Sequence, residues 1–285
     1  MIIQTIGVVG CGQMGAGIAE ISVLAGYNVL IYARNEDLNP ACRGRVQQAL
    51  QRSVSRGKLS VTEADAALAR LRGTAHLADL AAADLVIECV AEDLLLKQSI
   101  ARSLDDLLHP EALIASNTSS LSISQIALAT RRPDRVLGMH FFNPVPVMRL
   151  LELVRGLQTS DETLAHARKV GAYLGKITIT APDSPGFIVN RLLIPYIVEA
   201  IRAYADGLGE VAAVDNSVKL GVGHPLGPLA LADLIGLDVT LAIADVLYSA
   251  SGDPCFKAPP LLRRMVVTGQ LGRKAGRGFY EYRKS

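Results

Sequence analysis

The sequence has no tryptophan, few aromatic residues of any kind (5%) and no long apolar run. Its apolar runs are far shorter than the roughly 20 residues that span a membrane. The N-terminus lacks the charged, apolar and cleavage regions of an export signal. Lys plus Arg number 29 and Asp plus Glu 27, so the net charge is only +2. We therefore expect no membrane partner and no nucleic-acid partner.

Cysteine is also scarce. The four residues, Cys11, Cys42, Cys89 and Cys255, are scattered and form no Cys-x-x-Cys pair. This spacing argues against a metal site and against a disulfide framework, and we expect a reducing cytoplasm as the location. Cys11 lies in a tight turn with no His or second Cys nearby in the sequence, so we interpret it as a small, unreactive side chain.

Apolar residues are plentiful, at 50%, and supply a packed core. Up to about residue 180, short β-branched runs alternate with helical stretches, which predicts a Rossmann-like, doubly wound and mostly parallel sheet. The expected strands are 5–9, 28–32, 85–90, 113–115, 136–139, 150–154 and 176–180. The expected helices are 15–24, 40–56, 62–71, 94–107, 122–130 and 161–174.

The pattern changes at the Pro/Gly cluster of residues 181–186. We therefore predict a dinucleotide-binding domain over 1–182 and an all-helical substrate and dimerisation domain over 183–285. Residues 188–204, kinked at Pro195, and residues 211–220 and 229–248 read as helices. Residues 188–204 are apolar around most of a helical circumference, and a helix of this kind is buried in a large core or in a subunit interface. A helical domain of about a hundred residues could bury it alone, but we expect a homodimer.

A Gly-x-Gly-x-x-Gly motif lies between the first expected strand and helix, at Gly10, Gly12 and Gly15. Gly10 permits the tight turn, Gly12 lets the backbone approach a pyrophosphate, and Gly15 lets the helix pack close to the sheet. Gln13 and Met14 lie within the motif, and the N-terminus of the helix that follows offers N–H groups to phosphates. The strand–turn–helix context favours a dinucleotide site over a glycine-rich turn with no ligand.

Polar residues lie in or after three later strands and at the start of the helical part. Ser116–Ser120 follow the strand at 113–115, and this is more hydroxyl and amide groups than a helix N-cap needs. His140 ends a strand and is suited to proton transfer near neutral pH, although a lone His is more often structural. Glu152 lies in an aliphatic strand and needs a partner, for which His140 is a candidate; the alternative is an exposed strand face. Asn190 lies among apolar residues near the domain junction and could instead satisfy backbone groups there.

Together these segments resemble the short-chain 3-hydroxyacyl-CoA dehydrogenase family, in particular its 3-hydroxybutyryl-CoA members. The matching stretches run through the whole chain in the family's order. The matches are GCGQMGAGIA (10–19), SNTSSL (116–121), GMHFFNPVP (138–146), LELV (151–154), PGFIVNR (185–191), HPLGPL (224–229), GLD (236–238) and LGRKAGRGFY (271–280).

The resemblance implies an oxidoreductase of fatty-acid metabolism that interconverts 3-hydroxyacyl-CoA and 3-oxoacyl-CoA with a nicotinamide cofactor. It implies that His140 is the acid/base, that Glu152 is its partner, and that Ser119 and Asn190 hold the substrate oxygen. It places Glu92, Lys97 and Asn143 at the nicotinamide and Asn117 on the substrate side. Residues 43–58 match an arm that reaches the CoA tail. Arg52 and Arg56 there could meet phosphates, or form a solvated basic helix face.

At one position the sequence departs from the family. An NAD-type fold favours an acidic residue at the end of the second strand, for the ribose hydroxyls. Here Ala33 occupies that position, Arg34 follows, and the first carboxylate is Glu36. Arg34 could bind a 2′-phosphate, so we favour NADP over NAD. Alternatively, Arg34 points into solvent, or Glu36 folds back to the ribose, and NAD binds.

Two other functions stay open from the sequence. One is a dehydrogenase whose hydroxyacyl group is carried on an acyl carrier protein, because both carriers share a phosphopantetheine arm. The other is a non-catalytic dinucleotide-binding protein. The presence of His140, Glu152, Ser119 and Asn190 argues against the second.

Overall fold

The chain divides into two compact units, Met1–Ser184 and Pro185–Ser285. The computed structural model describes residues 2–35 and 38–282. The division lies two residues beyond the boundary expected from the sequence, within the same Pro/Gly cluster. None of the helices in these two described ranges is both long and apolar enough to cross a membrane.

The first unit is built on an eight-stranded sheet of order β3-β2-β1-β4-β5-β6-β7-β8. Only β6 and β7 pair antiparallel, and every other neighbouring pair is parallel. The strands are β1 Thr5–Val9, β2 Asn28–Tyr32, β3 Leu71–Thr74, β4 Leu85–Glu88, β5 Leu113–Ser116, β6 Val136–Phe141, β7 Leu150–Arg155 and β8 Ile177–Pro182. The strand order reverses between β1 and β4, and ligands of such sheets bind beyond the carboxyl ends of the strands at this point.

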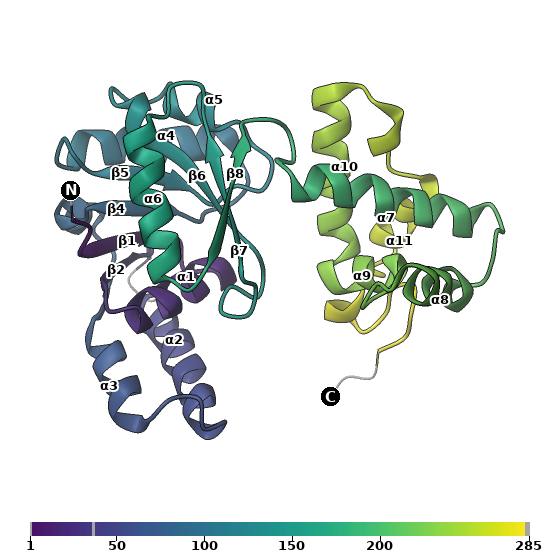
Figure 1. The fold of residues 1–285 in the computed structure, drawn as a ribbon, viewed down its shortest axis with the longest axis horizontal. Coiled ribbons are helices and arrows are strands. Elements are labelled where there is room, and N and C mark those ends of the chain that lie inside the picture. Colours follow the sequence, from purple (N-terminus) through teal and green to yellow (C-terminus); the bar gives the residue numbers. More distant parts are fainter. Residues whose placement is uncertain (1, 36–37, 283–285) are drawn as a thin grey trace. The chain divides into compact units, whose positions relative to one another are not determined.

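Helices cover both faces of this sheet, with α4 and α5 on one face and α1 and α6 on the other (Figure 1). The pair α2 and α3 extends away from the sheet beside β2 and β3 (Figure 1). The helices are α1 Gln13–Leu24, α2 Leu38–Ser55, α3 Val61–Ala69, α4 Leu94–Leu107, α5 Ile123–Ala127 and α6 Asp161–Tyr173. The expected Rossmann-like, mostly parallel fold is confirmed.

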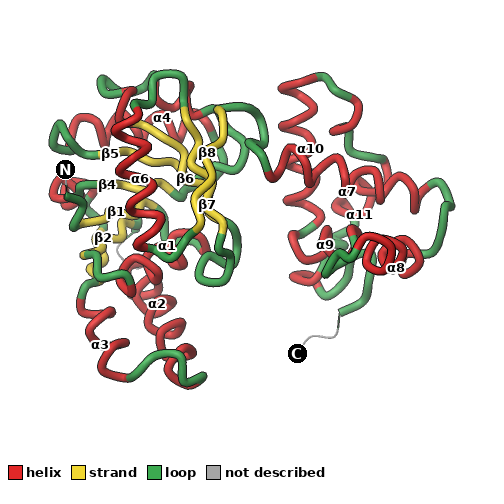
Figure 2. Tube along the Cα trace, viewed as in Figure 1, coloured by secondary structure: helices red, strands yellow, loops and turns green. Residues whose placement is uncertain are grey.

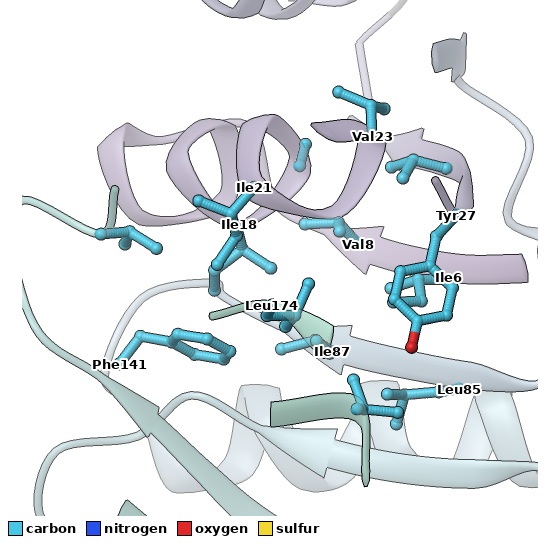
Figure 3. Packing of buried hydrophobic residues seen from close by; sticks show 14 of the residues in the cluster. Ile6, Val8, Ile18, Ile21, Val23, Tyr27, Leu85, Ile87, Phe141 and Leu174 are labelled. Carbon is cyan, nitrogen blue, oxygen red and sulfur yellow. The ribbon is translucent and has the colours of Figure 1, made fainter. Parts of the chain in front are cut away.

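The core beneath α1 fixes the position of the glycine-rich turn that precedes this helix. Ile18 and Ile21 of α1 point toward the sheet, where they lie with Val8 and Ile87 (Figure 3). Burial of each such side chain stabilises the fold by about 1.5–3 kcal/mol. The N-terminal end of α1 is thereby held over the carboxyl end of β1.

The second unit is helical (Figure 2), as the sequence predicts. Its helices are α7 Val189–Ala205, α8 Val211–Val222, α9 Pro228–Ile235, α10 Leu237–Ser251 and α11 Pro260–Val267. Two details differ from expectation. The helix expected over 229–248 is two helices, which separate at Gly236, where φ is +105°. Helix α7 is not apolar all round, because Arg191 and Glu199 are exposed while Ile194, Ile197 and Ile201 pack in the core.

The sequence argued against a disulfide framework, and its spacing gave no sign that two of the cysteines meet in the fold. Cys11, in the turn before α1, lies beside Cys42, in α2, with the Cα atoms 5.5 Å apart, a separation that a disulfide allows. Sequence spacing missed the pair because the partners are 31 residues apart and meet only when α2 packs on α1. The pair places the glycine-rich turn next to α2. Cys89 and Cys255 are free thiols, and burial raises the pKa of the Cys89 thiol.

Candidate active site

The glycine-rich turn has the form of a phosphate-binding loop. Gly10 has φ of +111°, and its N–H donates to the carbonyl oxygen of Tyr32, which joins the turn to β2. A Cβ at Gly15 would overlap the carbonyl oxygen of Gly10, whereas a Cβ at Gly12 would meet no heavy atom within 4 Å. Gly12 is the N-cap of α1, and no side chain caps this helix. The open space and the helix N–H groups suit a phosphate.

Two of these glycines should therefore respond differently to alanine. Gly15→Ala is expected to lower the melting temperature, since the added methyl group strikes the backbone of Gly10. Gly12→Ala should leave the melting temperature near that of the wild type and weaken dinucleotide binding by about tenfold or more, because the methyl group occupies the approach of the pyrophosphate. Thermal unfolding and fluorescence titration with NADPH measure the two effects. Unchanged binding in Gly12→Ala would contradict the assignment of this loop.

Antiparallel pairing of β6 and β7 places His140 directly opposite Glu152. Nδ1 of His140 lies 2.7 Å from Oε2 of Glu152. His140 is 6% exposed and Glu152 is fully buried, so the ring and the carboxylate interact with little screening by water. The Phe142 ring packs 4.4 Å from the imidazole, centroid to centroid. The contact fixes one ring nitrogen on a carboxylate, which is the arrangement that a general acid/base requires.

The polar loop after β5 is organised by Glu92. One oxygen of this side chain, Oε1, accepts from the Thr118 hydroxyl at 2.6 Å and from the Ser119 N–H and hydroxyl at 2.9 and 3.1 Å. It also accepts from the N–H and hydroxyl of Ser120, both at 3.2 Å. Burial alone would raise the pKa of Glu92, but Lys97 and these hydrogen bonds hold the pKa below its usual value. Glu92 therefore holds Ser119 at the carboxyl end of β5.

Glu88 is a buried carboxylate that the sequence reading missed. It ends β4, is 3% exposed, and lies 2.9 Å from Nζ of Lys97, itself 1% exposed. The argument applied to Glu152, that a carboxylate in an aliphatic strand needs a partner, applies equally to Glu88 in the run Leu85–Glu88. That signal was available in the sequence.

Two amides lie at the same edge of the sheet. Asn117 Oδ1 accepts from the N–H of Phe141 at 2.9 Å, so Asn117 joins the polar loop to the end of β6, next to His140. Asn143 Oδ1 accepts from Nε2 of Gln13 at 2.9 Å, which links the segment after β6 to the phosphate loop. The predicted cofactor residues Gln13 and Asn143 are thus neighbours, whereas Met14 is half-buried against the core.

A groove of about 850 Å³ runs along α1, α2 and the segment after β6. Its lining is rich in cations and includes Arg45, Arg52, Arg56 and Lys58. Arg45, which the sequence reading did not single out, donates from Nη1 to the carbonyl oxygen of Cys11. Glu20 also lines the groove, and burial raises the pKa of its carboxyl. Such a groove suits a ligand that carries several negative charges.

Comparison with known proteins agrees with this geometry. Residues 5–184 match the model of the 3-hydroxyacyl-CoA dehydrogenase NAD-binding domain, and residues 186–282 match the model of the C-terminal domain of the same enzymes. The chain belongs to the 3-hydroxyacyl-CoA dehydrogenase family. The expected resemblance is confirmed over nearly the full length, as is the expectation of a nicotinamide-dependent oxidoreductase.

Three relatives of this dehydrogenase are named for one substrate. The 3-hydroxybutyryl-CoA dehydrogenase of Mycobacterium tuberculosis is 48% identical over 98% of this chain and 99% of its own length. A probable 3-hydroxybutyryl-CoA dehydrogenase of Bacillus subtilis is 45% identical over 99% of this chain and 98% of its own. The crystal structure of (S)-3-hydroxybutyryl-CoA dehydrogenase from Ralstonia eutropha superposes with a TM-score of 0.95, at 46% identity, over 99% of this chain and 100% of that one. These names give no support to a carrier-protein substrate.

The dehydrogenase family binds NAD, and the acidic position at the end of β2 is occupied by Ala33. Ala33 is 4% exposed, and its N–H donates to Thr74 of β3. The Arg34 side chain that follows is exposed. Glu36, the alternative ribose ligand, lies outside the described residues. The described residues 33–35, at the end of β2, therefore include no carboxylate.

Asn190 belongs to the second unit, where it is the second residue of α7 and 7% exposed. Its role toward the substrate stays a prediction, as do the roles of the other site residues. No cluster of three His, Cys, Asp or Glu side chains that could hold a metal occurs in the described part of this dehydrogenase.

Proposed function

We propose that this enzyme interconverts 3-hydroxybutyryl-CoA, or another short 3-hydroxyacyl-CoA, with the 3-oxoacyl-CoA, in the fatty-acid metabolism of the cytoplasm. The observation that carries the proposal is the 2.7 Å contact between His140 Nδ1 and Glu152 Oε2. It supplies a proton carrier at the edge of the sheet where the phosphate loop lies. The names of the full-length relatives support the short acyl chain.

The residues at the carboxyl ends of β1 and β4 fit a nicotinamide dinucleotide. The open space above Gly12 and the uncapped start of α1 would hold the pyrophosphate. Ala33 and Arg34 would adjoin the adenosine ribose, and we propose NADP as the preferred cofactor. Glu92, Lys97 and Asn143 would lie at the nicotinamide end. When bound there, the cofactor donates or accepts the hydride.

His140 moves the proton. In the oxidative direction the imidazole takes the proton of the C3 hydroxyl, and in the reductive direction the imidazolium returns it. Because Nδ1 is engaged by Glu152, we assign the proton exchange to Nε2. The carboxylate of Glu152 stabilises the imidazolium and fixes the ring tautomer.

Ser119 and Asn190 are proposed to hold the substrate oxygen, and Asn117 to contact the substrate. A hydroxyl and an amide donor directed at this oxygen stabilise the negative charge that develops there. The backbone N–H of Ser119 donates to Glu92 at 2.9 Å, which fixes the position of the loop. The Ser119 hydroxyl, which donates to Glu92 in the structure, would turn its single proton to the substrate oxygen. Turnover of acetoacetyl-CoA with NADPH tests the function as a whole, and its absence would favour the non-catalytic alternative.

The cationic groove is proposed to bind the nucleotide phosphates of CoA through Arg52 and Arg56. The Arg52→Ala/Arg56→Ala variant is expected to raise KM for acetoacetyl-CoA about tenfold or more while kcat changes little, since ionic hydrogen bonds to phosphate are lost outside the reacting centre. The acetoacetyl thioester of pantetheine, which has no nucleotide, should show no such increase.

Arg43→Ala is the matched control for this prediction. Arg43 lies on the same helix, and its Nη1 donates to the carbonyl oxygen of Leu71 at 2.7 Å, outside the groove lining. Its KM for acetoacetyl-CoA should stay near that of the wild type. If the double variant also keeps its KM, Arg52 and Arg56 are only a solvated basic helix face.

The second unit is proposed to hold a homodimer. Large apolar side chains remain exposed on its helices, among them Leu192 of α7 and Leu220 of α8, and such surface is typical of an interface. Light scattering should give twice the mass of one chain at micromolar concentration. A stable monomer at this concentration would rule the dimer out.

A further inference from the structure

A buried ion pair lies beneath the polar loop. Its cation, Lys97, is placed above at the nicotinamide end of the cofactor, whereas its carboxylate, Glu88, has been given no role. Both oxygens of Glu88 face Nζ of Lys97, at 2.9 and 3.0 Å, and both side chains are almost fully buried. Removing two charges from water is costly, and apolar side chains of the same volume often stabilise a core as well. Stability alone therefore does not account for the pair.

The carboxylate of Glu88 is fixed from several sides. The hydroxyl of Ser116 donates to Oε2 at 2.7 Å, and the N–H of Val90 donates to Oε1. The donors come from β5 and from the segment after β4, so the carboxylate has one orientation relative to both strands. The ammonium group of Lys97 is fixed in turn, and it reaches the carbonyl oxygen of Val90 at 3.4 Å.

Lys97 also faces a second carboxylate. Its Nζ lies 3.5 Å from Oε2 of Glu92, whose other oxygen, Oε1, holds the N–H and hydroxyl of Ser119. The positive charge of Lys97 helps keep the pKa of Glu92 low despite burial. The contacts thus form one chain, Glu88 to Lys97, Lys97 to Glu92, and Glu92 to Ser119.

We propose that Glu88 is a positioning residue for Ser119, which it orients through Lys97 and Glu92. The proposal rests on the proposed role of Ser119 in holding the substrate oxygen. Without the negative charge of Glu88, the Lys97 ammonium attracts only the carboxylate of Glu92. Oε2 of Glu92 then moves toward the ammonium, and Oε1 turns away from the Ser119 loop.

A double-mutant cycle with Ser119→Ala tests this link. Glu88→Gln keeps the side-chain shape and removes the charge. It is expected to lower kcat for acetoacetyl-CoA reduction about tenfold, the scale of a small misplacement at the reacting centre. The Kd for NADPH, measured by fluorescence titration, should change by less than about threefold. In the Ser119→Ala background, Glu88→Gln should lower kcat little further, because the effects of residues that act through one group are not additive.

The outcomes separate this proposal from the proposed function. Suppose that Ser119→Ala lowers kcat, and that Glu88→Gln lowers kcat by the same factor with Ser119 and with Ala at that position. The link between Glu88 and Ser119 is then overturned, and the role of Ser119 stands. If Ser119→Ala has wild-type kcat, the role of Ser119 is rejected and the link with it. If Glu88→Gln does not fold, Ser116→Ala replaces it in the cycle. That variant removes one hydrogen bond and no charge, so the expected loss is smaller, about threefold.

Asp105→Asn controls for a general loss of rigidity. Asp105 is another buried carboxylate of the same unit, 3% exposed, and it binds Arg131 at 2.8 Å and Arg132 at 2.7 Å. Its contacts do not include the polar loop. The variant should lower the melting temperature and leave kcat unchanged. A fall in kcat equal to that of Glu88→Gln would show that any weakened buried ion pair slows the enzyme, and would overturn the proposal.

Discussion

His140→Ala is expected to lower kcat by about 10²–10⁴-fold, the usual contribution of a positioned general acid/base. The imidazole is the proton carrier of the proposed mechanism, and it is held 2.7 Å from a fully buried carboxylate. The affinity for the nicotinamide cofactor should change little, because the phosphate loop lies at β1 and α1. Steady-state kinetics with acetoacetyl-CoA and NADPH measure the loss.

Glu152→Ala should also lower kcat strongly, since the imidazolium loses the charge that stabilises it. The double variant is expected to be little slower than His140→Ala alone, because two residues that act as one unit are not additive. Full additivity of the two losses in activation free energy would reject the pairing. Glu152→Gln is the matched variant, because it keeps an oxygen for Nδ1–H and removes only the charge.

Folding must be checked in these variants. His140→Ala leaves the buried carboxylate of Glu152 without its imidazole partner, and loss of the hydrogen-bond partner of a buried charged group is destabilising. Thermal unfolding and NADPH titration identify a folded variant that is slow. The double variant, which removes both groups, should unfold at a higher temperature than His140→Ala, which separates the stability effect from the kinetic one.

The strands β1 and β2 could be predicted to the residue because their determinants are local, whereas α1 begins two residues earlier than expected, at Gln13. The strand Thr5–Val9 and the strand Asn28–Tyr32 have the predicted bounds, since each is a short β-branched run that ends in turn residues. The glycine spacing then predicts the tight turn that follows β1. The same reasoning failed at β3, where Arg72 and Gly73 interrupt the alternation of an edge strand, and at α11, which buries only Leu262 and Met265.

The candidate site was predictable as a set of residues and not as a geometry. Strand ends rich in polar groups marked Ser119 and His140, because parallel strands bring their carboxyl ends to one edge. His140 lies opposite Glu152 because β7 runs antiparallel to β6 in this register. No local sequence pattern encodes that direction. The contact between Cys11 and Cys42 depends likewise on the packing of α2, since contacts distant in sequence arise only when the elements meet.

NADPH should be the better cofactor of the wild-type enzyme. An acidic residue after β2 would accept the ribose hydroxyls and repel a 2′-phosphate, and Ala33 does neither. The guanidinium of Arg34, which is exposed, can bind this phosphate with a planar pair of donors. A hydrogen bond to a charged group contributes about 1.5–3 kcal/mol, and at about 1.4 kcal/mol per tenfold the preference should reach about one to two decades in kcat/KM.

The test is kcat/KM for NADPH and for NADH in the wild type, in Arg34→Ala and in Ala33→Asp/Arg34→Ala. Arg34→Ala alone should lower kcat/KM with NADPH and leave NADH nearly unchanged, because it removes the phosphate donor and adds no ribose acceptor. The double variant adds that acceptor and should shift the preference toward NADH. Equal or better use of NADH by the wild type would contradict the choice of NADP, as expected if Arg34 only faces solvent. If the wild type prefers NADPH and the double variant keeps that preference, the determinant lies outside residues 33 and 34.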